Sequence, residues 1–302
     1  METWDKVLAR NAKLLREDVR RRASGEKSLR HIRTGFRELD GTFGGVRIGV
    51  PTEVIAHTGD GKSALLRQFA EGCARDGGGV LWLVGEDPED ATAERQFAGD
   101  TGIDSMDIGR LELGDRQLDQ IDLAVRQAGP WAKHILPVFD LMTVDEVLST
   151  VDGTTTIGGA PLREVVLDYV QIFGDANNLE AEVARLGLEM QTRSKERRLA
   201  VLLGSQVSND VVKRGRDRFL ATHDVASMRP SIGDTEWCKR LEKTVKAVWS
   251  MYRPGRWLKE FGDANAVDDH AELHVIKQNF GSMGWIPLKW DGPTTRFSDG
   301  DH

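Results

Sequence analysis

The sequence lacks the features of a secreted or membrane-embedded protein. It has only two cysteines, Cys73 and Cys238, which lie far apart and show neither a disulfide framework nor the spacing of metal ligands. Such isolated cysteines are typical of buried thiols in a reducing compartment. The apolar runs fall short of the ~18 residues that a membrane-spanning helix needs, and residues 1–22 are charged throughout, unlike a signal peptide. We therefore expect a cytoplasmic protein that does not contact a membrane.

The chain also lacks an overall basic charge, because its 302 residues carry a formal net charge of −7. This charge is uneven: residues 1–33 contain ten Lys and Arg against five Asp and Glu, so the remainder carries about −12. An acidic protein can still bind nucleic acid if its cations line one surface, so the net charge excludes neither class of partner. The proportions of hydrophobic (39%) and charged (29%) residues are ordinary for a globular protein, and the length allows one large α/β domain.

The clearest motif is A-H-T-G-D-G-K-S at residues 56–63, between an apolar run at 52–56 and a helical pattern at 64–75. A strand, a glycine-rich turn, Gly-Lys-Ser and a helix form the phosphate-binding loop, although Ala56 replaces the usual first glycine. Backbone amides of such a loop surround phosphates, and the helix N-terminus adds partial positive charge. We expect Lys62 to reach the β- and γ-phosphates of ATP and the Ser63 hydroxyl to bind Mg²⁺. The predicted ATP-binding residues are Thr58, Gly59, Asp60, Gly61, Lys62, Ser63 and Ala64.

Three further apolar runs are of the kind that parallel sheets bury on both faces. Each run either ends in a polar residue or is followed by one. The runs occupy residues 79–84, 164–168 and 199–203, and the polar residues are Glu86, Asp168 and Gln206. Open α/β sheets place their ligands at this carboxyl edge. Glu86 is therefore a candidate general base for an attacking water, Asp168 a carboxylate near Mg²⁺, and Gln206 a polar group near the γ-phosphate. We interpret the neighbouring Asp87, Glu89 and Asp90 only as a helix start.

The two ends of the chain and its basic stretches are less specific. Apolar residues at helical spacing predict an amphipathic helix over 2–22, which either folds back onto the core or docks on another subunit. A polar loop is expected over 209–218, strands over 244–251, 273–277 and 285–290, and a frayed tail over 298–302. The basic residues of the two stretches are either solvated or contact the phosphates of a nucleic acid. They are Lys213, Arg214, Arg216 and Arg218 in the first, and Lys239, Arg240, Lys243 and Lys246 in the second.

Taken in order, these segments resemble the C-terminal motor domain of DnaB-type replicative helicases, from about residue 33 to residue 297. The matching segments are T-G-F-R-E-L-D at 34–40, V-V-L-D-Y-V-Q-I-F at 165–173, G-S-Q-V-S at 204–208, V-I-K-Q-N-F-G at 275–281 and T-T-R-F at 294–297. The resemblance implies a RecA-like α/β fold: a P-loop NTPase with a mostly parallel central sheet flanked by helices, plus an N-terminal helix.

The resemblance also implies an assembly and its ligands. It implies a ring, usually a hexamer, with ATP and Mg²⁺ at each subunit interface, single-stranded DNA in the central channel, and a helicase loader or primase as a further partner. Residues 1–32 would be a linker helix docked on a neighbouring subunit, 33–297 the motor domain, and 298–302 a disordered tail. Loops at 207–218 and 236–246 would face the channel, which makes Lys213, Arg214, Arg216, Lys239 and Arg240 the candidate DNA-binding residues. The absence of the family's N-terminal domain suggests a compact phage- or plasmid-encoded member.

The resemblance fails at one functionally important position. The family places an arginine two residues after a lysine on a closing strand and inserts it into the neighbour's ATP site, whereas here Lys277 is followed by Gln278 and Asn279. Lys277 is kept as a catalytic candidate that acts across the interface. Because an arginine finger contributes about 10³–10⁵ in rate, either another cation such as Arg253 or Arg256 substitutes, or turnover is slow.

Three functions are therefore compared. The sequence favours an ATP-dependent ring helicase or translocase on single-stranded DNA. A RecA-like DNA-binding ATPase or assembly factor, with slow turnover and no strand separation, is the alternative that Asn279 favours. A small-molecule kinase is disfavoured, because the segment after Gln206 resembles channel loops and sheet more than an arginine-rich lid.

Overall fold

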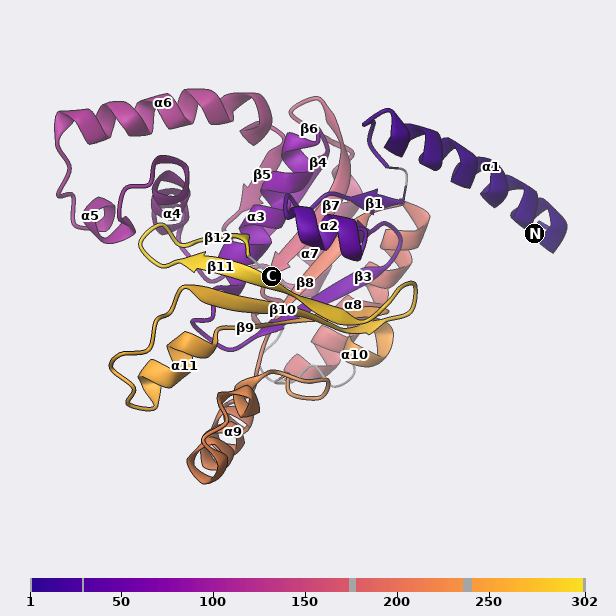
Figure 1. The fold of residues 1–302 in the computed structure, drawn as a ribbon. Coiled ribbons are helices and arrows are strands. Elements are labelled where there is room, and N and C mark those ends of the chain that lie inside the picture. The colour runs from indigo at the N-terminus through magenta and orange to yellow at the C-terminus, as the bar shows by residue number, and fades with distance from the viewer. Residues whose placement is uncertain (1, 29, 174–177, 236–240, 301–302) are drawn as a thin grey trace.

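The computed structural model of the protein describes residues 2–28, 30–173, 178–235 and 241–300. Within these residues a ten-stranded sheet forms the centre of the molecule (Figure 1), in the order β12-β11-β10-β9-β3-β8-β7-β4-β5, with β6 paired to β7. Its strands are β3 (Pro51–Ala56), β4 (Gly79–Val84), β5 (Ile135–Val138), β6 (Thr156–Ile157), β7 (Ala160–Asp168), β8 (Ala200–Gln206), β9 (Ala247–Tyr252), β10 (His270–Gln278), β11 (Gly284–Asp291) and β12 (Arg296–Asp299).

The sheet is parallel from β9 to β5 and antiparallel from β9 to β12. β3 and β4 are buried along their whole length, as their continuous apolar sequences predict. A short separate ladder pairs β1 (His31–Ile32) with β2 (Val46–Arg47). The predicted fold class, a mostly parallel α/β sheet with flanking helices and an N-terminal helix, is confirmed.

Two apolar clusters cover the two faces of the sheet. On one face Leu65 and Phe69 of α3 (Lys62–Arg75) pack with Trp249 of β9, beside α2 (Arg37–Thr42). On the other face Val147 of α7 (Val144–Gly153) and Leu186 of α8 (Leu179–Glu196) pack over β7 and β8, beside α10 (Leu241–Thr244). This double covering fixes the position of β3, the strand after which the loop begins.

Two helical parts extend from this body in Figure 1. Between β4 and β5 the chain forms α4 (Glu89–Thr101), α5 (Ser105–Gly109) and α6 (Asp115–Ala132), which share a small apolar cluster around Ala98, Ile103 and Ile108. On the opposite side α1 (Trp4–Ala23) projects from the body, and Asp18 is its one buried residue. None of the described helices combines the length and apolar composition that a membrane span requires.

The structure corrects three expectations. The segment expected as a polar loop is the helix α9 (Asn209–Thr222), because Val211 and Gly215 form a buried stripe under its polar surface. A short helix α11 (Pro254–Glu260), opened by its proline, was not expected at all. The tail begins later than 298, because Ser298 and Asp299 belong to β12 and pair with β11. Residues 301–302 and the predicted DNA-binding residues Lys239 and Arg240 lie outside the described part of the chain.

Candidate nucleotide-binding site

A cavity of about 240 Å³ lies at the carboxyl edge of the sheet, where β3 passes into α3. The loop adopts left-handed backbone at Gly59 (φ 83°) and Gly61 (φ 97°). Glycine is required at 61, because a Cβ there would lie 2.9 Å from the Phe297 ring. Most of the predicted ATP-binding residues line this cavity together with two of the predicted catalytic residues: Thr58, Gly59, Gly61, Lys62, Ser63, Ala64, Glu86 and Gln206.

Lys62 and Asp168 form a buried ion pair beside the cavity. The ammonium Nζ lies 2.7 Å from a carboxylate oxygen of Asp168 and 4.7 Å from the centre of the Tyr169 ring. Only 7% and 3% of the two side chains are exposed, so each charge depends on the other for its stabilisation. A phosphate entering the loop therefore competes with Asp168 for the ammonium group.

Ser63 and Asp168 also line one small cavity next to the main one, which makes them candidate Mg²⁺ ligands. Their hydroxyl and carboxylate oxygens are the hard donors that Mg²⁺ prefers. The described residues contain no cluster of three or more His, Cys, Asp and Glu side chains suited to a metal ion. Proteins usually hold Mg²⁺ through one or two side chains together with the substrate's phosphates and water.

Glu86 reaches the same edge from the next strand. It follows β4, and Val84 of β4 is paired with Asp168 at the end of β7, so the two carboxylates lie at neighbouring strand ends. Partial burial raises the pKa of the Glu86 carboxyl, while the Lys62 ammonium lowers it. The adjacent Asp87 is instead bound in an ion pair by Arg95. Glu86 therefore lines the cavity as a carboxylate with a raised pKa, a property that a proton acceptor needs.

Gln206, the last residue of β8, is fixed through its backbone. The Gln171 side chain donates to the Gln206 carbonyl (3.2 Å) and accepts from the Gln206 amide (3.3 Å). Gln171 belongs to the short helix η1 (Val170–Ile172), directly after Asp168 and Tyr169. These two hydrogen bonds join the segment at 165–173, which contains the end of β7, to the end of β8.

Two arginines that sequence analysis did not place at the loop hold it from the other side. A guanidinium N–H of Arg253 donates to the Gly59 carbonyl (3.1 Å), and this group stacks over Trp290 at 4.3 Å. Arg256 pairs with Asp60 (2.7 Å), which also accepts a bond from Trp257. Burial raises the pKa of Asp60 to about 6, against the lowering effect of Arg256. The Asp60 side chain is bound by Arg256 and Trp257, so only the backbone of Asp60 is available to a phosphate.

These contacts bear on whether Arg253 or Arg256 can substitute for the arginine finger that Asn279 replaces. Both bind the loop of their own chain, so any cation that they supply acts within the same subunit. Lys277 and Asn279 do not line the cavity. A register shift between β10 and β9 falls between Val275 and Lys277, and the exposed Asn279 bonds through its backbone to the Lys246 carbonyl (3.1 Å). Lys277, which is predicted to act on a neighbouring subunit, therefore lies outside the nucleotide cavity of its own subunit.

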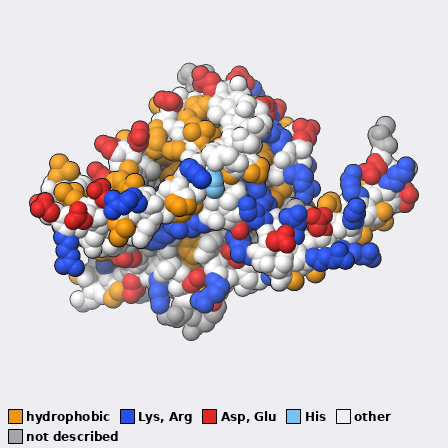
Figure 2. Space-filling view, turned by 90° about the horizontal axis from the view of Figure 1, so that it is seen from above, with side chains coloured by type: hydrophobic (Ala, Val, Ile, Leu, Met, Phe, Trp, Pro, Cys, Tyr) orange, Lys and Arg blue, Asp and Glu red, His pale blue; other side chains and the backbone are white. Residues whose placement is uncertain are grey.

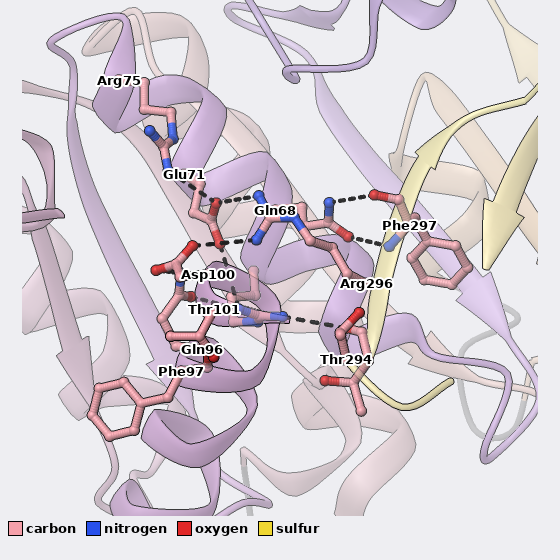
Figure 3. A network of polar contacts seen from close by, with 12 residues as sticks. Gln68, Glu71, Arg75, Gln96, Phe97, Asp100, Thr101, Thr294, Arg296 and Phe297 are labelled. Carbon is pink, nitrogen blue, oxygen red and sulfur yellow. Dashed lines mark hydrogen bonds and ion pairs between the residues drawn. The ribbon is translucent and has the colours of Figure 1, made fainter. Parts of the chain in front are cut away.

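A polar network ties the C-terminal strand to α3 and α4 (Figure 3). Glu71 of α3, with 3% of its side chain exposed, pairs with Arg67, Arg75 and Arg296. Gln68 makes two 2.8 Å hydrogen bonds with the backbone of Phe297. Arg67 also donates to the carbonyl of Thr295, a residue that lines the cavity. The network thus fixes the wall of the cavity that the T-T-R-F segment supplies.

The exposed cations Lys213, Arg214 and Arg216 lie on α9, which projects from the body below the sheet in Figure 1. Lys213 and Arg214 make only long contacts with carboxylates, at 3.7 and 3.5 Å. Such exposed pairs contribute little to stability, so these charges remain available to an anionic partner.

The sheet order, the glycine-rich loop and the carboxylate of β7 define the class of protein: a P-loop NTPase with a RecA-like core. The model of the DnaB-like helicase C-terminal domain matches residues 31–299, and the chain belongs to this family. The family predicted from the sequence is thereby confirmed.

The similar proteins agree with this assignment. The chain is 21% identical to the replicative DNA helicase DnaB of Haemophilus influenzae over 287 residues, which are 93% of this chain and 58% of that protein. It is 22% identical to the replicative DNA helicase DnaC of Bacillus subtilis over 264 residues, 85% of this chain and 54% of that one. The chain therefore spans little more than half the length of these relatives.

Two solved structures share the fold. One is an isolated ATPase domain, which superposes with a TM-score of 0.80 at 18% identity and covers all of both chains. The other is a DnaB-like replicative helicase, described together with its interactions with primase. It superposes with a TM-score of 0.78 at 18% identity, over all of this chain and 68% of that one.

Proposed function

We propose that this chain is the motor of a ring-shaped, ATP-dependent helicase that moves along single-stranded DNA. The observation that carries the proposal is the meeting of the loop at 58–64 with Glu86 and Gln206 at one cavity, beside the Lys62–Asp168 pair, in a member of the DnaB-like family. The bacterial cytoplasm would be its place of action, and a phage or plasmid replicon its genetic source.

The chemistry would be hydrolysis of ATP. Backbone amides of the loop and the Lys62 ammonium would hold the phosphates. Ser63 and Asp168 would hold Mg²⁺, which neutralises charge on the phosphate oxygens when it is bound. Glu86 would take a proton from a water as its oxygen bonds to the γ-phosphorus, and the bond to the bridging oxygen breaks with its electron pair leaving on ADP. Lys277 of the neighbouring subunit would supply a cation to the site.

DNA would bind along α9. Its exposed cations suit a phosphate backbone, and Gln206 at the end of β8 lies three residues before the first residue of the helix. A loss of the γ-phosphate sensed by Gln206 would therefore reach α9 directly along the chain.

Assembly would use α1, as the linker helix of residues 1–32. Its exposed apolar residues Trp4, Leu8, Leu15 and Val19 share one face, flanked by Arg and Lys side chains. The exposed part of α6 is the complement: it carries Leu118 and Val125 on one side and Leu123 on the other, with acidic side chains between them. Figure 2 shows these two surfaces at opposite edges of the molecule: many Lys and Arg side chains lie on the α1 arm, and apolar and acidic side chains, with some basic ones, lie at the other edge. A helix that docks on the next subunit closes a ring, and a hexamer is the expected size.

The proposed function is tested by strand displacement. A forked DNA duplex should separate only with hydrolysable ATP, and single-stranded DNA should stimulate ATP hydrolysis. Replacing Lys213, Arg214 and Arg216 by Ala should reduce the slope of log affinity against log salt by about 2, because each phosphate contact on a single strand contributes about 0.7. Three exposed cations outside α9, Arg110, Lys133 and Lys195, are the matched control and should leave this slope unchanged.

The same assay separates the alternative function. A DNA-binding ATPase or assembly factor would bind ATP and DNA, turn over slowly and leave the fork intact, as Asn279 in place of the arginine favours. Absence of DNA-stimulated hydrolysis together with an intact fork would sink the helicase proposal. A helicase loader or primase is the further partner that we propose for the assembled ring.

The docking of α1 gives a prediction of its own. Replacing Leu8 and Val19 by Asp should weaken ring assembly at least tenfold, because each apolar side chain contributes about 1.5–3 kcal/mol when buried. Mass photometry with nucleotide and DNA measures the subunit number. Leu188 of α8, exposed to 54% compared with 52% for Leu8, is the control position for the same substitution. Equal masses for all three proteins would exclude docking through this face.

A further inference from the structure

The second residue of the phosphate-binding loop motif contacts a distant part of the chain. The Nε2 atom of His57 lies 2.7 Å from the carbonyl oxygen of Met228, and both residues are almost fully buried. Met228 ends the short helix η3 (Val225–Met228), which follows α9. The loop is therefore joined directly to the part of the protein that carries the exposed cations of α9.

The hydrogen bond fixes the state of the His57 ring. Burial lowers the pKa of His57 to about 4, so the ring is neutral at pH 7. A carbonyl oxygen can only accept, so Nε2 carries the proton and donates it. Nδ1 is then an acceptor, and it is buried without a hydrogen-bond partner among the described residues. The His57 and Trp257 rings pack edge to face, with their centres 4.8 Å apart. The orientation of the His57 ring therefore depends on Met228 and Trp257.

The helix η3 is in turn bound tightly to α9. The Ser227 hydroxyl donates to the Gly215 carbonyl of α9 at 3.0 Å. A Cβ at Gly215 would lie 2.5 Å from the sulfur of Met228, so glycine is needed for this close approach. Met228 itself is 1% exposed. Because η3 and α9 are packed this closely, a displacement of the Met228 carbonyl displaces α9 as well.

We propose that His57 is a positioning residue that couples the phosphate-binding loop to α9 through the Met228 carbonyl. This inference rests on the proposed function, because it requires DNA on α9. When the loop closes on phosphates, the His57 ring moves with it and carries η3 and α9. The path is separate from that of Gln206, which leads along the chain from the end of β8 to the start of α9. Coupling between two ligands is reciprocal, so ATP must change DNA affinity by the same factor as DNA changes ATP affinity.

The coupling is measured as the ratio of affinities for a fluorescent oligo-dT with and without a non-hydrolysable ATP analogue. For the wild type we expect a ratio of about 5–150, the usual range of such couplings. His57→Ala should lower the ratio and leave only the coupling that the Gln206 path carries. His57→Gln, whose amide nitrogen can take the place of Nε2, should restore most of it. His134 is the matched control, because its ring also bonds a backbone carbonyl, that of Ala74, away from this path; His134→Ala should keep the wild-type ratio.

The outcomes separate this inference from the proposed function. If the wild type binds no DNA, or binds it with a ratio of one, both fail. If the wild type shows coupling and His57→Ala keeps it, only the role of His57 is overturned. The Ser227→Ala variant cuts the same path at its second bond and decides the case if His57→Ala does not fold. Its ratio should fall as well, and an unchanged ratio overturns the path.

Discussion

Replacing Glu86 by Gln should reduce ATP hydrolysis about 10²–10⁴-fold while ATP still binds, because the amide cannot accept a proton from water. The phosphates would still be held by the loop and Lys62, so the affinity for ATP should change little. Single-turnover hydrolysis and equilibrium binding of a fluorescent ATP analogue measure the two quantities separately.

The pH dependence provides a second readout for the same residue. Glu86 must be ionised to act as a base, and its pKa is raised by burial. The wild-type rate should therefore fall as the pH drops through a value above the usual pKa of glutamate, and this fall should be absent from the residual rate of Glu86→Gln. Glu89, an exposed carboxylate in the first turn of α4, is the control. Equal losses in Glu86→Gln and Glu89→Gln would assign the effect to local charge and reject Glu86 as the base.

The parts of the fold that the sequence predicted are those specified locally. The buried strands were visible because each is a continuous apolar run, and the loop because its glycines, lysine and serine are adjacent. The start of helix α7 is specified locally as well, because Thr143 and Glu146, three residues apart, form a capping box there. The carboxyl ends of parallel strands meet at one edge, so Glu86 and Asp168 could be placed near the loop without knowing any contact between side chains.

The contacts that were not predicted join segments far apart in the chain. Arg253 binds the backbone carbonyl of Gly59, which lies 194 positions away in the sequence. Arg256 binds the side-chain carboxylate of Asp60, 196 positions away. Arginine is so often a solvated surface residue that the sequence carried no sign of these partners. The helix α9 was hidden for another reason, because its fully buried residues are only Val211 and Gly215, and Asp, Lys and Arg occupy many of its other positions. Its packing depends on Met228, which belongs to a different element.

The second large effect concerns stability. Replacing Glu71 by Ala should reduce the free energy of unfolding by about 3–5 kcal/mol, because it leaves the buried guanidinium of Arg67 without its carboxylate. Arg67 has 5% of its side chain exposed, and Arg296 loses the same partner. For a domain of this size each kcal/mol lowers the melting temperature by about 2–4 °C. Denaturant titration and thermal unfolding measure the loss.

The cause of this loss can be separated from simple loss of packing. Glu189 of α8 also pairs with an arginine one helical turn away, but 42% of its side chain is exposed, so Glu189→Ala should cost less than about 1 kcal/mol. In the double variant Arg67→Met with Glu71→Ala the unpaired buried charge is gone, and a large part of the stability should return. If the double variant is as unstable as Glu71→Ala alone, the cost lies in the cavity left by the glutamate side chain. Recovery of stability would instead show that Glu71 is needed because it neutralises the buried charge of Arg67. The same carboxylate binds Arg296 of β12, next to the wall of the nucleotide cavity.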